Sequence, residues 1–359
     1  MNILFLTRYN HLGPSSRFRV FQYEPLLKKS GMETFIFPVS LDNYSAANRL
    51  FERLKQIKLY KVMSELFWLK IVELVKEKQP DIIFIQKVPF TPYELRVIKK
   101  LTKKLIYDLD DAIFIKQPEW KPSGKELYEF QRRQEYFGKM LSEYNHIIVG
   151  NEFLKQYVIK FNSNVTVIPT PIDTDKFKPR EKINVGNLII GWIGTSTNLP
   201  YLNNIKDALK KLCVKYSNVR LKIVSNDFMG FDESWVDKKM WNLEDEVSDT
   251  QSFDIGIMPL SDNNWARGKC GFKLLQYMGA GIPIICSPVG VNKEIVKNGV
   301  NGFLADTLDD WYNKLSKLIE YNYIRKTFSK AGIETVERKY SLKKIFPVFY
   351  ETIKKASHV

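Results

Sequence analysis

The stretch RGKCGFKLLQYMGAGIPIICSPVG, residues 267–290, shows how this chain folds. Cations and glycines precede an apolar helical segment, the helix breaks at Gly281-Ile282-Pro283, and a short apolar run follows at 283–286. Glycine and proline end helices, and a short apolar run between such residues is typical of a buried parallel strand. The stretch therefore predicts helices and parallel strands in alternation, which is the α/β class.

The same alternation extends in both directions from this stretch. Apolar runs of strand length, separated by charged helical segments, occur at 3–6, 34–38, 81–86, 104–107, 146–149 and 165–168, and again at 187–193, 220–224, 255–258, 283–286 and 302–304. Between the two series, Pro169-Thr170-Pro171 and the charged stretch 175–182 indicate a linker. The pattern predicts two Rossmann-like domains in tandem, 1–183 and 184–340. A last helix in 341–359, with a kink at Pro347, can cross back onto the first domain.

Composition limits the possible functions. The chain has 359 residues, three cysteines, three histidines and a formal net charge of +15. No secretory signal or spanning segment is present, so we expect a cytoplasmic protein. No metal-ligand spacing occurs, so we expect neither a metal site nor a cofactor. The positive charge suits nucleic acid, a membrane surface or an acidic substrate, but no nucleic-acid-binding signature accompanies it, so we expect no nucleic acid partner.

Three loops of the second series have the residues of phosphate sites. Gly194, Thr195 and Ser196 follow the strand 187–193, and a second loop ends at Gly271 and Phe272. Backbone N–H groups at a helix start and the helix dipole favour phosphate. The alternative is an ordinary tight turn.

Basic side chains accompany these loops. Arg267 and Lys269 can neutralise a departing diphosphate, and Lys273 adds charge. The alternative is a solvated basic loop before an amphipathic helix. Residues 287–294 form another polar loop, with Gly290, and Asn292 is expected to cap the next helix.

A family resemblance rests on these motifs. The order GWIG (191–194), DIGIMPL (254–260), GKCGFKLLQYMGAGIPIICSPVG (268–290) and NGVNGFLA (298–305) is similar to the group 1 retaining glycosyltransferases of the family 4 type. In the first half, NEFLKQYV and VTVIPTPIDTDKFKP resemble the segment where that family leaves its first domain. The resemblance implies a GT-B fold of two Rossmann-like domains facing a central cleft.

The resemblance also implies a reaction. The C-terminal domain would bind a nucleoside diphosphate sugar, and the N-terminal domain a saccharide or lipid-linked acceptor with a free hydroxyl, as in surface polysaccharide or glycoconjugate synthesis. Two alternatives stay open: a GT-B nucleotide-sugar epimerase, and a non-catalytic nucleotide-sugar-binding protein. The family's paired glutamates fall on Gly268 and Gln276, so both acids are absent. Gln276 can still hydrogen-bond a ribose hydroxyl.

In the first domain, Asp108, Asp110 and Asp111 follow a predicted strand, where many relatives carry a histidine that contacts the donor sugar. One of them can contact a hydroxyl or act as a general base. The alternatives are an acid cluster at a helix start and, less favoured, a metal site.

The first loop of the chain also has a candidate phosphate contact. Gly13 lies in a loop before Arg17 and Arg19, which can pair with a phosphate or belong to a solvated helix start. His11 is expected to be a surface residue. The expected catalytic residues are Asp110, Asp111, Arg267 and Lys269, and the expected donor-binding residues are Gly13, Arg17, Gly194, Thr195, Ser196, Gly271, Phe272, Lys273, Gln276 and Gly290.

A basic, apolar helical stretch at 49–78 offers a further partner. It mixes Phe67, Trp68 and Ile71 with many lysines, and more lysines follow at 99–104. The mixture fits an anionic membrane surface on which the protein is peripheral, or a crossover helix with a solvated basic side.

Overall fold

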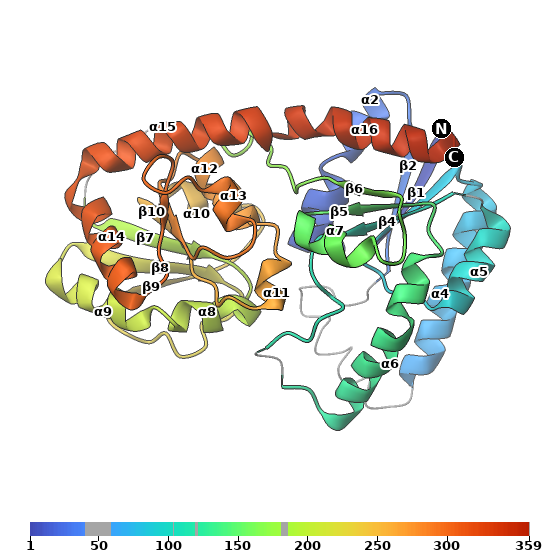
Figure 1. Ribbon diagram of the computed structural model, residues 1–359, viewed down its shortest axis with the longest axis horizontal. Helices are drawn as coiled ribbons and strands as arrows, with labels where there is room; N and C mark the ends of the chain where they lie inside the picture. The colour runs from blue at the N-terminus through green and yellow to red at the C-terminus, as the bar shows by residue number, and fades with distance from the viewer. Residues whose placement is uncertain (40–58, 103, 119–120, 181–185, 359) are drawn as a thin grey trace. The chain divides into compact units, whose positions relative to one another are not determined.

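The computed structural model describes residues 1–39, 59–102, 104–118, 121–180 and 186–358. The chain divides into two compact units (Figure 1). The first contains residues 1–116, 120–170 and 346–359, and the second contains 117–119 and 171–345. Each unit has one six-stranded sheet in which all pairings are parallel. The predicted α/β class is confirmed.

The first sheet has the strand order β2-β1-β3-β4-β5-β6. β3 and β4 are buried along their whole length. The order reverses between β1 and β3, and the carboxyl ends of strands at such a reversal are where α/β proteins bind ligands. Its strands are β1 (Asn2–Thr7), β2 (Glu33–Pro38), β3 (Ile82–Gln86), β4 (Leu105–Leu109), β5 (His146–Val149) and β6 (Val165–Val167).

The segment 17–30 does not form one continuous helix. A π-helical turn (Arg17–Phe21) follows α1 (Pro14–Ser16), and α2 (Glu24–Lys29) starts afresh with a proline in its first turn. The two long helices α5 and α6 both begin with a capping box, Thr91 with Glu94 and Ser123 with Glu126. The remaining bounds are α4 (Leu59–Lys78), α5 (Pro92–Leu101), α6 (Gly124–Leu141) and α7 (Glu152–Val158).

The second sheet has the order β12-β11-β10-β7-β8-β9, which reverses between β7 and β10. The edge strand β9 was not predicted, because its sequence VDKKM alternates polar and partly exposed residues instead of forming a buried run. Its strands are β7 (Leu188–Ile193), β8 (Val219–Ser225), β9 (Val236–Met240), β10 (Ile255–Met258), β11 (Ile284–Cys286) and β12 (Phe303–Leu304).

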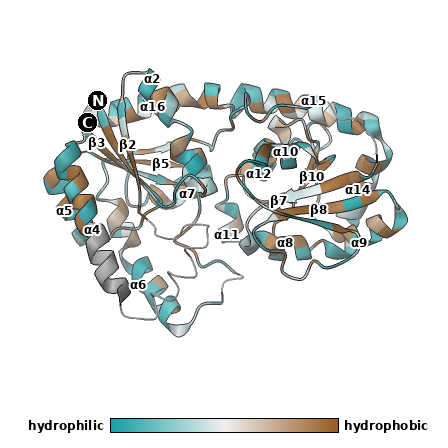
Figure 2. Cartoon of the chain, turned by 180° about the vertical axis from the view of Figure 1, so that it is seen from behind, coloured by the Kyte–Doolittle hydropathy of each residue, from teal (hydrophilic) through white to brown (hydrophobic). Residues whose placement is uncertain are grey.

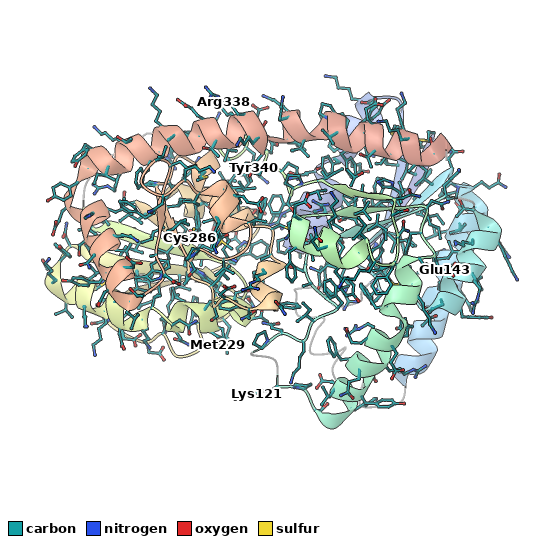
Figure 3. All side chains as sticks on the ribbon, in the orientation of Figure 1. Lys121, Glu143, Met229, Cys286, Arg338 and Tyr340 are labelled. Atoms are coloured by element: carbon teal, nitrogen blue, oxygen red, sulfur yellow. The ribbon has the colours of Figure 1, made fainter. Side chains whose placement is uncertain are left out.

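Helices cover both faces of the second sheet, whose strands are largely apolar while the helices have one polar side (Figure 2). On the face with α8, α9 and α14, a core forms around Trp192 and Trp311. Cys286 lies inside this unit (Figure 3). The helices are a 3-10 turn (Ser196–Asn198), α8 (Leu199–Asn203), α9 (Lys206–Lys215), α10 (Glu246–Gln251), α11 (Asn264–Arg267), α12 (Phe272–Gly279), α13 (Asn292–Ile295), α14 (Leu308–Glu320) and α15 (Asn322–Lys339).

The units do not divide at residue 183, where the sequence suggested a junction. Residues after Thr170 group with the second unit: Phe177 is fully buried, and its carbonyl oxygen would lie 3.3 Å from a Cβ at Gly279. The last helix, α16 (Leu342–His358), contains Pro347, and its residues from 346 onward belong to the first unit. There Phe349 stacks on Tyr23 with ring centroids 4.0 Å apart.

Candidate functional site

In the second unit, a lysine lies over Gly194, the glycine that follows β7. A Cβ at Gly194 would stand only 2.7 Å from Cε of Lys273, in the first turn of α12. The Lys273 ammonium is 5.6 Å from the ring centroid of Trp192. Gly194 and Lys273 are therefore neighbours at the reversal of this sheet, where a ligand is expected.

Two further glycines hold the other two predicted loops against each other. Gly271, the N-cap of α12, has φ +66°, a left-handed conformation that favours glycine, and a Cβ there would stand 2.5 Å from Ile295 of α13. Gly290 has φ +52°, and its Cβ would stand 3.0 Å from the carbonyl oxygen of Arg267. Asn292 does not cap α13 as expected. Its amide donates to the Ser287 carbonyl and closes the loop.

The predicted catalytic cations of this unit have protein partners. Arg267 is exposed and donates to Asp262 through Nε (2.7 Å) and Nη2 (3.0 Å). This pairing holds the pKa of Asp262 below its usual range. Lys269 Nζ donates to Asn198 Oδ1 at 3.0 Å and lies 5.7 Å from the centroid of the Trp265 ring. An incoming diphosphate therefore competes with Asp262 for the Nε and Nη2 donors of Arg267.

The hydroxyl loop after β7 is already hydrogen-bonded. The Ser196 N–H donates to Asn226 Oδ1 at 2.8 Å, and Thr195 Oγ1 accepts from Asn198. A 3-10 turn and the short α8 follow, in place of a long helix. Gln276 is 4% exposed, which leaves little of its amide for a ribose hydroxyl.

A polar pocket of about 250 Å³ opens beside these loops, still within the second unit. The residues after β10, β11 and β12 form much of it, including Asp262, Ser287 and Asp306, and Asn204 and Trp311 complete the lining. Its place at the carboxyl edge of three parallel strands is that of a ligand site in α/β proteins.

In the first unit, the predicted aspartates meet a lysine that the sequence reasoning missed. Lys87 follows β3 with φ +60°, and its Nζ pairs with Asp110 at 3.2 Å and with Asp111. Ser15 donates to Asp110 Oδ2 at 2.5 Å. A non-glycine residue in this backbone region costs about 1 kcal/mol or more, so the pairing holds Lys87 at this edge.

Burial works against both charges, and the pairing overcomes it. Although desolvation lowers it, the pKa of Lys87 is raised by Asp110 and Asp111. Although desolvation raises it, the pKa of Asp110 is held below its usual range by Lys87, Arg19 and Ser15. No helix begins at Asp111, where a turn follows, so the helix-start interpretation is wrong.

Arg19 does not offer its charge to a phosphate. It is 1% exposed and forms a bidentate pair with Asp108, with Nε 3.0 Å from Oδ2, while Nη1 donates to the Ile168 carbonyl at 2.6 Å. Asp108 is fully buried and belongs to this pair. The pair fixes the carboxyl end of β4 against the π-helical turn.

Gly13 and Arg17 stabilise their own loop. A Cβ at Gly13 would stand 2.3 Å from Cβ of Tyr9. Arg17 is 7% exposed, and its Nη1 donates to the carbonyls of His11 and Leu12 at 3.1 Å each. His11 is exposed, as expected.

Part of the proposed membrane face points inward. Ile71 of α4 is 1% exposed, and Trp68 packs against Phe90 with centroids 5.8 Å apart. These two side chains fit the crossover-helix interpretation, whereas residues 49–58 lie outside the described part. Among the described residues, no helix is long and apolar enough to span a bilayer, and no group of three or more potential metal ligands gathers.

The second unit contains a segment that matches a known protein family. Residues 189–321 match the family model Glycosyl transferases group 1. This group 1 segment contains Gly194, Arg267, Gly271, Lys273 and the polar pocket. A sucrose synthase from Melioribacter roseus is 34% identical over 79 residues, 20% of this chain and 10% of that protein.

Solved structures match nearly the whole chain. Alr3699/HepE of Anabaena, in complex with UDP and glucose, has a TM-score of 0.69 at 16% identity and 99% coverage of both chains. A glycosyltransferase from Rickettsia africae gives 0.70 at 16% identity, covering 99% of this chain and 98% of that one. Sucrose-phosphate synthase from Thermosynechococcus elongatus gives 0.68 at 13%, with coverage of 99% and 98%.

These likenesses establish the GT-B fold, as the sequence predicted. The group 1 segment, residues 189–321, thus lies in the second unit of a GT-B fold. Lys87 and Ser15 were not predicted as site residues, although the position of Lys87 in the sequence could have identified it. Lys87 is the first residue after a buried strand, the position that singled out Asp108 to Asp111.

Proposed function

We propose that this protein is a retaining glycosyltransferase. It moves a sugar from a nucleoside diphosphate sugar to a hydroxyl acceptor, saccharide or lipid-linked, in the cytoplasm during synthesis of a surface polysaccharide or glycoconjugate. The main support is that the group 1 segment contains the cluster of Gly194, Lys273 and Gly271 at the reversal of its sheet. The structures of Alr3699/HepE with UDP and with UDP-glucose favour a uridine diphosphate sugar as the donor.

The diphosphate would bind between the glycine that follows β7 and the start of α12. Gly194 lets a phosphate approach the backbone, and Lys273, beside it, neutralises charge. The N-terminus of α12, behind Gly271 and Phe272, contributes its dipole. Lys269 and Arg267 would stabilise the second phosphate as the sugar leaves, with Arg267 exchanging one bidentate anion, Asp262, for another.

The first unit would position the acceptor. A lowered pKa makes Asp110 a weak base at neutral pH, because efficient general bases have pKa values near the working pH. We therefore assign Asp110 and Asp111 to hydrogen bonds with hydroxyl groups, with Lys87 fixing their orientation. The acceptor proton would pass to the departing phosphate oxygen, on the face from which the acceptor attacks.

A substitution of Lys273 tests the donor site. In Lys273→Met, affinity for UDP is expected to fall about tenfold, the loss of one charged hydrogen bond. Lys211→Met, on the exposed surface of α9, is the matched control and should bind UDP as the unaltered protein does. Isothermal titration calorimetry measures both. Equal affinities in the two variants would refute the placement of the diphosphate beside Gly194.

The double variant Arg267→Ala/Lys269→Ala tests the leaving-group assignment. We expect weaker UDP binding and a larger loss of kcat, because charge on the diphosphate grows as the sugar departs. Transfer from UDP-sugars is followed as UDP release. Unchanged affinity and kcat would remove both residues from the site.

A non-catalytic nucleotide-sugar-binding protein is the second candidate, because glycine at 268 and buried Gln276 replace two acids. An enzyme slowly hydrolyses its donor when no acceptor is present. Tight UDP-sugar binding without hydrolysis or transfer across UDP, GDP, TDP and ADP sugars would favour the binding protein. A changed sugar configuration without transfer would indicate the epimerase.

A further inference from the structure

The polar pocket of the second unit has the wrong charge for a phosphate. Its volume is about 250 Å³, and two aspartates, Asp262 and Asp306, line it. The other lining residues are Asn204, Ile205, Pro259, Leu260, Ser261, Ser287, Leu308 and Trp311, so the described wall contains no lysine, arginine or histidine. Carboxylates without a cation among them disfavour an anion. The pocket therefore suits an uncharged ligand better than a nucleotide.

Hydrogen-bonding groups of both kinds are unused in this pocket. Asp306 is exposed, and its carboxylate forms no ion pair and accepts no hydrogen bond from the described residues. Ser287 Oγ accepts from the Leu260 N–H at 2.9 Å. Ser261 Oγ accepts from the side-chain amide of Asn204, also at 2.9 Å. Neither serine hydroxyl donates to a described residue, so the pocket offers two donors beside a strong acceptor.

Apolar side chains complete the wall. Pro259 and Leu260 directly follow β10, and Leu308, which begins α14, is 47% exposed. A sugar ring combines hydroxyl groups, which both donate and accept, with C–H groups that pack on apolar surface. Pockets for drug-sized ligands have about 300–1,000 Å³. A pocket of about 250 Å³ therefore has the size for one sugar ring.

Asp262 connects this pocket to the proposed diphosphate site. It lines the pocket, and Arg267 donates to its carboxylate through Nε and Nη2. Both side chains are about half exposed, so breaking this ion pair costs little. When a diphosphate takes Arg267, the Asp262 carboxylate becomes free to accept from a ligand in the pocket.

We propose that this pocket binds one uncharged sugar ring. Asp306, Ser261 and Ser287 form its hydrogen bonds, and Asp262 joins them when Arg267 moves to a diphosphate. The sugar site itself does not depend on the proposed glycosyl transfer, whereas the link through Arg267 rests on it. In a transferase that extends a glycan, the ring is a sugar unit of that glycan other than the one that receives the transferred sugar.

The test uses the full-length protein and the methyl glycosides of glucose, galactose, mannose and N-acetylglucosamine, titrated by saturation-transfer-difference NMR. At least one glycoside should bind. Asp306→Ala should weaken it about tenfold, the loss of one charged hydrogen bond. Asp309→Ala removes an exposed acid of α14 outside the pocket, so this matched control should bind like the unaltered protein. Binding of none of the glycosides, or equal affinities of the two variants, would overturn the site.

Folding and ligand charge are checked separately. Asp306 and Asp309 are both exposed, so the two variants should melt at the temperature of the unaltered protein. The 6-phosphate of the sugar that binds best should bind more weakly than its methyl glycoside, because the carboxylates of the pocket disfavour an anion. Tighter binding of the sugar phosphate would contradict the assignment to an uncharged ring.

Arg267→Met tests the role of Asp262 without any nucleotide. The variant frees the Asp262 carboxylate, so sugar affinity should rise about twofold to fivefold, the value of one exposed ion pair. An unchanged affinity would refute the participation of Asp262. UDP should produce the same rise in the unaltered protein. A rise in Arg267→Met but none with UDP would refute the assignment of Arg267 to the diphosphate.

The outcomes for UDP and for the sugar separate this inference from the proposed function. UDP binding without binding of any glycoside would refute the sugar pocket alone. Glycoside binding that depends on Asp306, without binding of any nucleotide, would refute the donor site and leave the pocket standing.

Discussion

The carboxyl edges of the two sheets are built differently. At the first, opposite charges neutralise one another: Arg19 with Asp108, and Lys87 with Asp110 and Asp111. At the second, lysines lie near aromatic rings and glycines, as Lys273 does beside Trp192 and Gly194. Ion pairs fix the shape of the first edge, whereas at the second edge glycines let neighbouring loops and side chains approach closely.

This difference indicates that the stability of the first edge, and not of the second, depends on its own charged pairs. Removing one partner of a buried pair leaves an uncompensated charge in a poorly solvated place. Moving an exposed lysine or arginine from one anion to another costs little, because water screens both states. The first edge should therefore respond to substitution in stability, and the second in ligand affinity.

The largest effect on stability is expected for Arg19→Met, which leaves the buried carboxylate of Asp108 without its arginine partner. We expect the free energy of unfolding to fall by about 3–5 kcal/mol, measured by urea denaturation. Lys343→Met, which breaks the exposed pair with Asp175, should leave it unchanged. The double variant Arg19→Met/Asp108→Leu should recover most of the loss. A loss no larger than that of Lys343→Met would show that the first edge does not depend on its pair.

Asp110→Asn should have a smaller, pH-dependent effect, about 1–3 kcal/mol at neutral pH for a lost charged hydrogen bond. The folded-state pKa of Asp110 lies below its unfolded value, so its contribution is present above that unfolded value, about 3.9. It disappears as pH falls through the folded pKa. The difference in the free energy of unfolding between the unaltered protein and Asp110→Asn should be constant from about pH 5 to 8. It should disappear in stronger acid. A difference that widened in acid would reverse the sign of the shift.

The smallest effect in stability, but not in binding, is expected for Gly194→Ala. The new Cβ meets the flexible end of Lys273, which can move aside, and also the edge of the buried Trp192 ring at 2.9 Å, so the melting temperature should fall, but less than in Gly191→Ala. UDP affinity should fall a few-fold, about 1 kcal/mol, because Lys273 is displaced. In Gly191→Ala the Cβ would stand 1.9 Å from the Phe253 ring, so that variant should be destabilised more strongly. The opposite pattern would mean that Gly194 serves packing.

Much of the fold was readable from the sequence because most strands are buried apolar runs. Five of the six residues of β1 are fully buried, and such a run has no other stable place in a globular chain. β9 was not predicted, because Lys238 and Lys239 interrupt the apolar pattern of this edge strand. The break within 17–30 escaped because Arg19 looks like a surface residue until its partner is known.

The candidate site was readable only in part, for a physical reason. The glycines at 194 and 271 could be picked out as candidates because glycine just before a helix lets the backbone approach a phosphate. The pairing of Arg19 with Asp108 joins residues 89 positions apart and depends on strand register, which composition does not reveal.

The return of α16 to the first unit has a consequence for synthesis on the ribosome. The rings of Tyr23 and Phe84 both pack against Phe349. Phe349 is translated only after the second unit, so these contacts form late. The N-terminal half of the chain therefore cannot complete its core while it emerges, although domains generally fold in the order of synthesis. The second unit, which apart from 117–119 is contiguous from 171 to 345, can close first. The segment from residue 346 onward therefore completes the core of the unit whose first strands are made earliest.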